Sequence, residues 1–120
     1  MRMTNVKRLV VGMTAAAALL AFAGTAAAQD AKADKGAKVY ADQKCSICHA
    51  IAGKGNAKGS LDDIGTKYKA DEIRQWIVDP VAMTAKHKAE RKPAMPAKYA
   101  ALPKDDLDAL VAYLATLKKK

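Results

Sequence analysis

Two cysteines and a histidine lie within five consecutive residues of this chain, in the stretch Cys45-Ser46-Ile47-Cys48-His49. On a helical turn, residues three and four positions apart share a face, so both thiols and the imidazole can reach one ligand. This spacing is typical of covalent haem attachment, in which the thiols bind the porphyrin edge and the imidazole binds the iron. The motif therefore predicts a haem held by these three side chains.

Three other roles for the cysteine pair agree less well with the sequence. A thioredoxin-type Cys-x-x-Cys needs a βαβ context, and nothing after the motif alternates strand and helix. A structural zinc site needs four ligands, and beyond the motif the chain offers no cysteine and one histidine, His87. A disulfide in an exported protein is chemically permitted, but it leaves His49 without a role. The haem interpretation accounts for the whole motif.

The first 28 residues predict a secretory signal peptide. Arg2, Lys7 and Arg8 give a positive start, an uncharged run follows, and three alanines ending at Ala28 fit a cleavage site. The uncharged residues 9–28 are also just long enough to span a bilayer, so an uncleaved anchor stays open. Because this run is mostly alanine and only mildly hydrophobic, we expect cleavage, export and no stable membrane insertion afterwards.

The predicted mature chain, residues 29–120, forms one domain that is small and basic. A chain of this size buries a marginal apolar core, to which a covalent haem would add apolar volume. It has 18 basic and 12 acidic side chains, a net charge of +6, which two haem propionates would reduce to about +4. Its lysines are scattered rather than clustered with aromatic residues, which favours acidic protein partners over nucleic acid.

Helices are predicted at both ends of the mature chain. Residues 30–43 have a helix-forming composition, with Gly36 and Tyr40 on one face. Glycine inside a helix costs about 1 kcal/mol relative to alanine, which a close crossing by the C-terminal helix would justify. An incidental glycine in an ordinary amphipathic helix remains the alternative. The last helix is marked by leucine and valine at helical spacing: Leu107, Leu110, Val111, Leu114 and Leu117.

Between these ends, the glycine-rich residues 50–67 predict a loop on the side of the haem that His49 binds. One of its backbone carbonyls should accept the Nδ1 proton of His49 and so direct the other nitrogen to the iron. A second helix is predicted over residues 70–79 and stopped by Pro80. Trp76 lies on its inner face, where a buried indole N–H would need an acceptor.

A second axial ligand is predicted in the stretch Lys92-Pro93-Ala94-Met95-Pro96. Prolines on both sides stiffen the backbone and can hold the Met95 thioether inward, although methionine usually fills core space. Met83 competes for this role but lacks the prolines. The charged residues 81–92 predict a solvated turn or short helix with His87 on the surface. Iron bound by His and Met has a raised reduction potential and no open coordination position, which suits electron transfer.

The order of these motifs resembles the single-haem class I c-type cytochromes of the bacterial periplasm. The resemblance implies an all-α fold of about three to five helices around one haem c, with the N- and C-terminal helices crossing. It implies thioether attachment at Cys45 and Cys48, and axial ligation of the iron by His49 and Met95. It also implies attachment outside the cytoplasm, and hence a periplasmic location. Relatives often carry Pro-x-Leu after the haem motif, where this chain has Gly59-Ser60-Leu61.

The expected function is electron transfer rather than enzymatic catalysis, by a monomer that docks to redox proteins. Lysines beside an open haem edge would steer acidic partners toward it: Lys44, Lys54, Lys92 and Lys98. One alternative is a haem subunit tethered to a larger oxidoreductase complex. Another is a haem sensor or peroxidase-like protein, which would require that Met95 does not bind the iron.

Overall fold

The computed structural model describes residues 14–119, with side chains from residue 27 onward. The chain divides into two compact units, Met1–Asp30 and Ala31–Lys120. The charged start of the predicted signal peptide lies outside the described residues, and its cleavage stays a prediction. Among the residues that are described, no helix combines the length and hydropathy needed to cross a bilayer.

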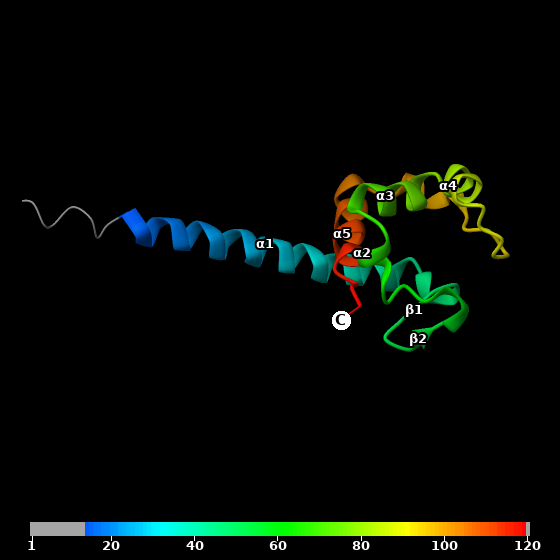
Figure 1. The fold of residues 1–120 in the computed structure, drawn as a ribbon, viewed down its shortest axis with the longest axis horizontal. Helices are drawn as coiled ribbons and strands as arrows, with labels where there is room; N and C mark the ends of the chain where they lie inside the picture. Colours follow the sequence, from blue (N-terminus) through cyan, green and yellow to red (C-terminus); the bar gives the residue numbers. More distant parts are fainter. Residues whose placement is uncertain (1–13, 120) are drawn as a thin grey trace, which may run out of the picture. The chain divides into compact units, whose positions relative to one another are not determined.

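Between residues 14 and 119 the chain forms five α-helices, three short 3-10 helices and one small hairpin (Figure 1). The all-α expectation is therefore confirmed. The α-helices are α1 (Thr14–Asp42), α2 (Ile64–Lys67), α3 (Ala70–Val78), α4 (Pro80–His87) and α5 (Lys104–Ala115). The 3-10 helices are η1 (Cys45–Ile47), η2 (Ala57–Gly59) and η3 (Ala97–Ala101), and the antiparallel strands are β1 (Ala50–Ile51) and β2 (Lys54–Gly55).

Three element boundaries differ from the sequence-based expectation. Helix α5 ends at Ala115, so Leu117, which was expected on the last helix, follows it. The first helix begins at Thr14 instead of about residue 30, because its alanine-rich beginning has high helix propensity. Pro80 starts a helix as well as following one. Asp79 is the N-cap of α4 and its carboxylate accepts the backbone N–H of Ala82 at 3.1 Å, so Pro80 occupies the first helical position, where proline is tolerated.

In the second unit, Ala31–Lys120, the Ala31–Asp42 part of α1 crosses α5 (Figure 1). A Cβ atom on Gly36 would overlap the carbonyl oxygen of Ala109 and the Cβ of Tyr113. The predicted close crossing at this glycine is therefore confirmed. Helix α3 completes the core, whose buried members come from α1, α3 and α5: Val39, Ile73, Ile77, Leu107, Leu110, Val111 and Leu114.

An ion-pair cluster also connects α3 to α5. Arg74 on α3 donates to the Asp108 carboxylate at 2.6 Å, and Lys104, one turn before Asp108 on α5, donates at 2.7 Å. The hydrogen bonds from Lys104 and Arg74 lower the pKa of Asp108 to about 2. The carboxylate is therefore charged at neutral pH and satisfies both basic groups.

Candidate haem site

The Cys-x-x-Cys-His motif forms the helical turn that its spacing predicts. It begins with η1 and continues the turn, with the backbone N–H groups of Cys48 and His49 donating to the carbonyl of Cys45 at 3.1 and 2.9 Å. Both cysteines are free and half-buried. Burial raises the pKa of the Cys45 thiol, while the positive charge of Lys98 acts in the opposite direction. The turn thus presents two thiols and an imidazole, with no disulfide between the two cysteines.

His49 is oriented by a hydrogen bond from its ring to the loop that follows. Its Nδ1 lies 3.0 Å from the carbonyl oxygen of Gly59. Because a carbonyl can only accept, Nδ1 carries the proton and Nε2 keeps a lone pair for a metal. Burial lowers the pKa of His49; the Gly59 carbonyl acts to raise it, and the Arg91 charge lowers it further. The expected carbonyl acceptor exists, and Gly59 provides it.

The Gly59 carbonyl is held in place by short-range structure on both sides. Asn56 caps η2 with its side chain, which accepts the backbone N–H of Lys58 at 3.1 Å. After the glycine, the N–H of Leu61 donates to the carbonyl of Ala50 in β1 at 2.8 Å. The segment expected as a plain loop therefore contains a hairpin, η2 and α2, and these elements fix the position of the acceptor.

Helix α1 reaches the attachment segment through Tyr40. The Tyr40 hydroxyl donates to the carbonyl of His49 at 3.4 Å, and its ring meets Tyr113 of α5 edge-on at 6.2 Å. Burial, with smaller contributions led by Cys45 and Tyr113, raises the pKa of Tyr40 to about 12. The hydroxyl is therefore a neutral donor at physiological pH. The helix crossing and the attachment turn are coupled through this one side chain.

Trp76 presents a buried donor that lacks an acceptor. Within the part of the chain described, its indole Nε1 is the one buried side-chain nitrogen or oxygen without a hydrogen-bond partner. The indole stacks on the His87 ring at 5.5 Å between centroids and lies 6.2 Å from the Tyr68 ring. The prediction that His87 lies on the surface is confirmed, because the residue is exposed, but the sequence did not indicate its stacking on Trp76. A buried unpaired donor is costly, so the site fits a bound group that carries acceptor atoms.

Met95 lies between the core and a small apolar cavity. It is half-buried and packs against the core cluster. With Pro80, Val81, Thr84 and Ala94 it lines a cavity of about 130 Å³ next to α4. Met83 is more deeply buried in α4, where it is 3% exposed. Met83 is fully buried and Met95 is half-buried, and Met95 is the one that borders this cavity.

Comparison with known proteins supplies the family. The family model for cytochrome c matches residues 33–118, a range that contains Cys45, Cys48, His49 and Met95. The chain belongs to the cytochrome c family. Haem-based electron transfer is the chemistry of this family, and haem c is its cofactor.

One relative of this cytochrome c is cytochrome c oxidase subunit 2 of Alkalihalophilus pseudofirmus. The two are 30% identical over 95 residues, which cover 72% of this chain and 26% of the relative. The chain therefore spans about a quarter of that protein's length. No solved structure matches the chain significantly.

The residues present in this cytochrome c fit a covalently bound haem. Two free thiols, a histidine whose Nε2 is available and a buried indole donor without a partner supply attachment, ligation and a hydrogen bond. A thioether from Met95 is internal as well. By contrast, no group of three or more His, Cys, Asp or Glu side chains in the described residues could hold a metal ion, so the zinc alternative gains no support.

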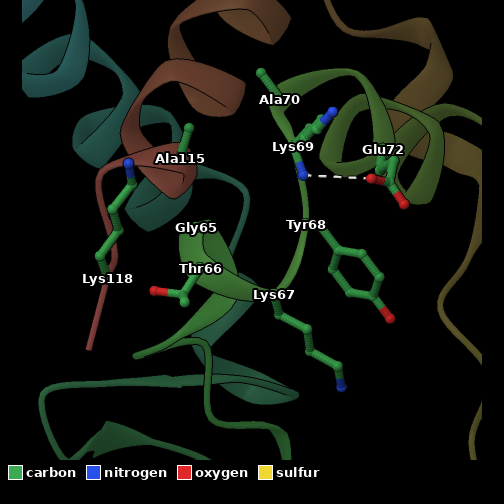
Figure 2. Close-up of a pocket in the computed structure, with 9 residues that line it drawn as sticks. All are labelled: Gly65, Thr66, Lys67, Tyr68, Lys69, Ala70, Glu72, Ala115 and Lys118. Carbon is green, nitrogen blue, oxygen red and sulfur yellow. Dashed lines mark hydrogen bonds between the residues drawn. The ribbon is translucent and has the colours of Figure 1, made fainter.

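A second cavity of this cytochrome c lies away from the predicted haem ligands. It measures about 420 Å³ and is formed by α2, the beginning of α3 and the end of the chain, between Gly65 and Lys118 (Figure 2). Tyr68, whose ring lies near Trp76, also lines this cavity, whereas Trp76 and His87 do not. None of its lining residues is a predicted attachment point or axial ligand. It therefore plays no part in the haem assignment.

Proposed function

We propose that this cytochrome c is a periplasmic carrier of single electrons with one covalently attached haem. Cys45 and Cys48 would form the thioethers, and His49 and Met95 would bind the iron. The observation that carries the proposal is the hydrogen bond from His49 Nδ1 to the Gly59 carbonyl. It orients a neutral imidazole with Nε2 available beside two free thiols, an arrangement that serves a metal-bound porphyrin.

The side chains of the site hold and tune the cofactor rather than react themselves. When bound, the haem supplies an iron that alternates between Fe(II) and Fe(III). The Gly59 carbonyl keeps His49 in one tautomer, and a Met95 ligand would leave the iron without an open coordination position for a substrate. The Trp76 indole is available to donate to an acidic group of the porphyrin. These roles are those of an electron carrier and not of an enzyme.

The proposal predicts a mature protein with one haem added to its mass. Expressed in cells that mature such proteins, the exported chain should begin at Gln29 and carry a single porphyrin through two thioether bonds. Intact-mass measurement of the purified protein tests both points at once. Replacing both cysteines, as Cys45→Ser with Cys48→Ser, should remove the added mass. A colourless wild-type protein with free thiols or a disulfide would contradict the proposal.

The surface beside the attachment turn favours an acidic redox partner. Ile47, between the two cysteines, is 68% exposed, one of two large hydrophobic side chains that are strongly exposed in the described residues. Lys44 and Lys54 are exposed on either side of the motif in sequence, and Lys98 is close enough to influence the pKa of Cys45. An apolar contact bordered by lysines suits transient docking to a carboxylate-rich surface.

Electron transfer to an acidic partner should therefore slow as salt increases. Dissolved ions screen exposed charges, with a Debye length of about 8 Å at physiological ionic strength, so added salt weakens the attraction between the two proteins. Stopped-flow second-order rates should fall several-fold between low and high salt, and less steeply for a Lys44→Gln, Lys98→Gln variant. A salt-independent rate in the wild type would refute electrostatic docking and would leave the haem assignment intact.

A tethered haem subunit of a larger oxidoreductase is the second candidate. It is favoured by the similarity to a protein named as an oxidase subunit. Retention of residues 1–28 on the mature protein, together with sedimentation with the membrane fraction, would support tethering. A mature chain that begins at Gln29 in the soluble periplasmic fraction would support the diffusing carrier.

A further inference from the structure

The segment that carries Met95 has few contacts with the rest of the molecule. From Lys88 to Pro96, Met95 is half-buried and every other residue is exposed. The backbone N–H of Ala89 donates to Thr84 at 3.0 Å, which ties the beginning of the segment to α4. Across residues 90–95, the described structure contains no backbone hydrogen bond outside helices and strands. Some other interaction must hold this part of the chain in place.

Besides the packing of Met95 against the core, one hydrogen-bonding side chain holds this segment. The Arg91 guanidinium donates from Nη2 to the carbonyl of Cys48, which is 43 residues away in the sequence. No other side chain of residues 88–96 makes a hydrogen bond within the described structure. The contact joins the segment that carries Met95 directly to the turn that carries His49.

Gly59 makes room for this contact. A Cβ atom at residue 59 would overlap both the Arg91 guanidinium and the carbonyl of Cys48. The carbonyl of the same glycine accepts the proton of His49 Nδ1. Gly59 thus orients His49 through its carbonyl and, because it has no side chain, leaves space for the Arg91 guanidinium. The Arg91 charge is also close enough to lower the pKa of His49.

We propose that Arg91 is a positioning residue that fastens the Met95 segment to the haem attachment turn and thereby determines how firmly Met95 is held on the iron. The inference rests on the proposed function, because it takes Met95 as the sixth ligand. A hydrogen bond from a charged donor is roughly twice as strong as a neutral one. The Arg91 contact is therefore stronger than a typical backbone hydrogen bond, of which residues 90–95 have none outside helices and strands in the described structure. Arginine suits the role because its planar fork places one nitrogen on the carbonyl while the other lies against Gly59.

The test measures how readily an added ligand displaces Met95 in the full-length ferric holoprotein. With Arg91→Gln, the Met95 segment should detach more often, so imidazole should bind about tenfold more tightly and the weak red absorption band of the Fe–S bond should decrease. Arg91→Lys should fall between wild type and Arg91→Gln, because lysine keeps the charge but not the fork. Lys86→Gln is the matched control, since Lys86 is exposed and makes no hydrogen bond in the described structure.

The outcomes separate this inference from the proposed function. An unchanged imidazole affinity in Arg91→Gln, in a wild-type background that shows the red band, overturns the role of Arg91 alone. Absence of the band in the wild type overturns Met95 ligation itself. A purely structural role for Arg91 would lower the denaturant midpoint of the whole protein without a selective gain in imidazole affinity, and that result also overturns the inference.

Discussion

Replacing Met95 with alanine is expected to abolish the red absorption band of the ferric protein and to lower its reduction potential markedly. A thioether ligand favours Fe(II) and raises the potential, and axial ligands set haem potentials over a range of roughly 0.8 V. The loss should be a substantial part of that range. Exogenous ligands such as cyanide should then bind rapidly, because the sixth position is open. Spectroelectrochemical titration and ligand-binding rates measure both effects.

Met83→Ala is the control for this experiment. Met83 is 3% exposed in α4, so its truncation should cost roughly 2–5 kcal/mol of unfolding free energy through the cavity it leaves. The red band and the potential should remain close to those of the wild type. If Met83→Ala removes the band and Met95→Ala keeps it, Met83 is the ligand. If the wild type has no red band and neither variant changes the potential, a sensor or peroxidase-like protein becomes the better interpretation.

Replacing Gly36 with alanine is expected to destabilise the protein by roughly 1–3 kcal/mol, although helix propensity alone predicts a gain of about 1 kcal/mol. The added methyl group would meet the backbone oxygen of Ala109 and the Cβ of Tyr113. Neither atom can move aside without shifting α5. The two effects have opposite signs, so the measured sign decides between them. Denaturant unfolding followed by circular dichroism gives the free energy.

Ala41→Gly on the same helix is the matched control. Ala41 is exposed, so this change tests propensity alone and should cost about 1 kcal/mol. A stabilised Gly36→Ala protein would mean that the helices are farther apart in solution than the structure shows. A loss in Gly36→Ala that is accompanied by a weaker red band would indicate that the crossing also supports the haem site through Tyr40.

Much of the fold followed from local patterns in the sequence. The apolar residues of α5 from Leu107 to Leu114 are buried as their helical spacing predicts, since amphipathic periodicity depends on the backbone geometry of the helix itself. The glycine at position 36 indicated a close crossing, and α5 was the expected partner. The sequence predicts that Pro80 stops a helix, and its second role at the beginning of α4 depends on the Asp79 cap. Propensity describes one element at a time, and it does not reveal which of two adjacent helices uses a shared boundary residue.

Some features of the site also follow from the sequence, and others depend on the tertiary structure. The spacing of Cys45, Cys48 and His49 by itself determined that two thiols and an imidazole lie together, because side chains three and four residues apart are neighbours on one helical face. Tertiary structure decided that Gly59 orients the histidine, that His87 stacks on Trp76 and that Arg91 reaches Cys48. Backbone carbonyls are chemically alike in every residue, and a flexible arginine can reach many partners. Only the folded arrangement of distant segments selects among them.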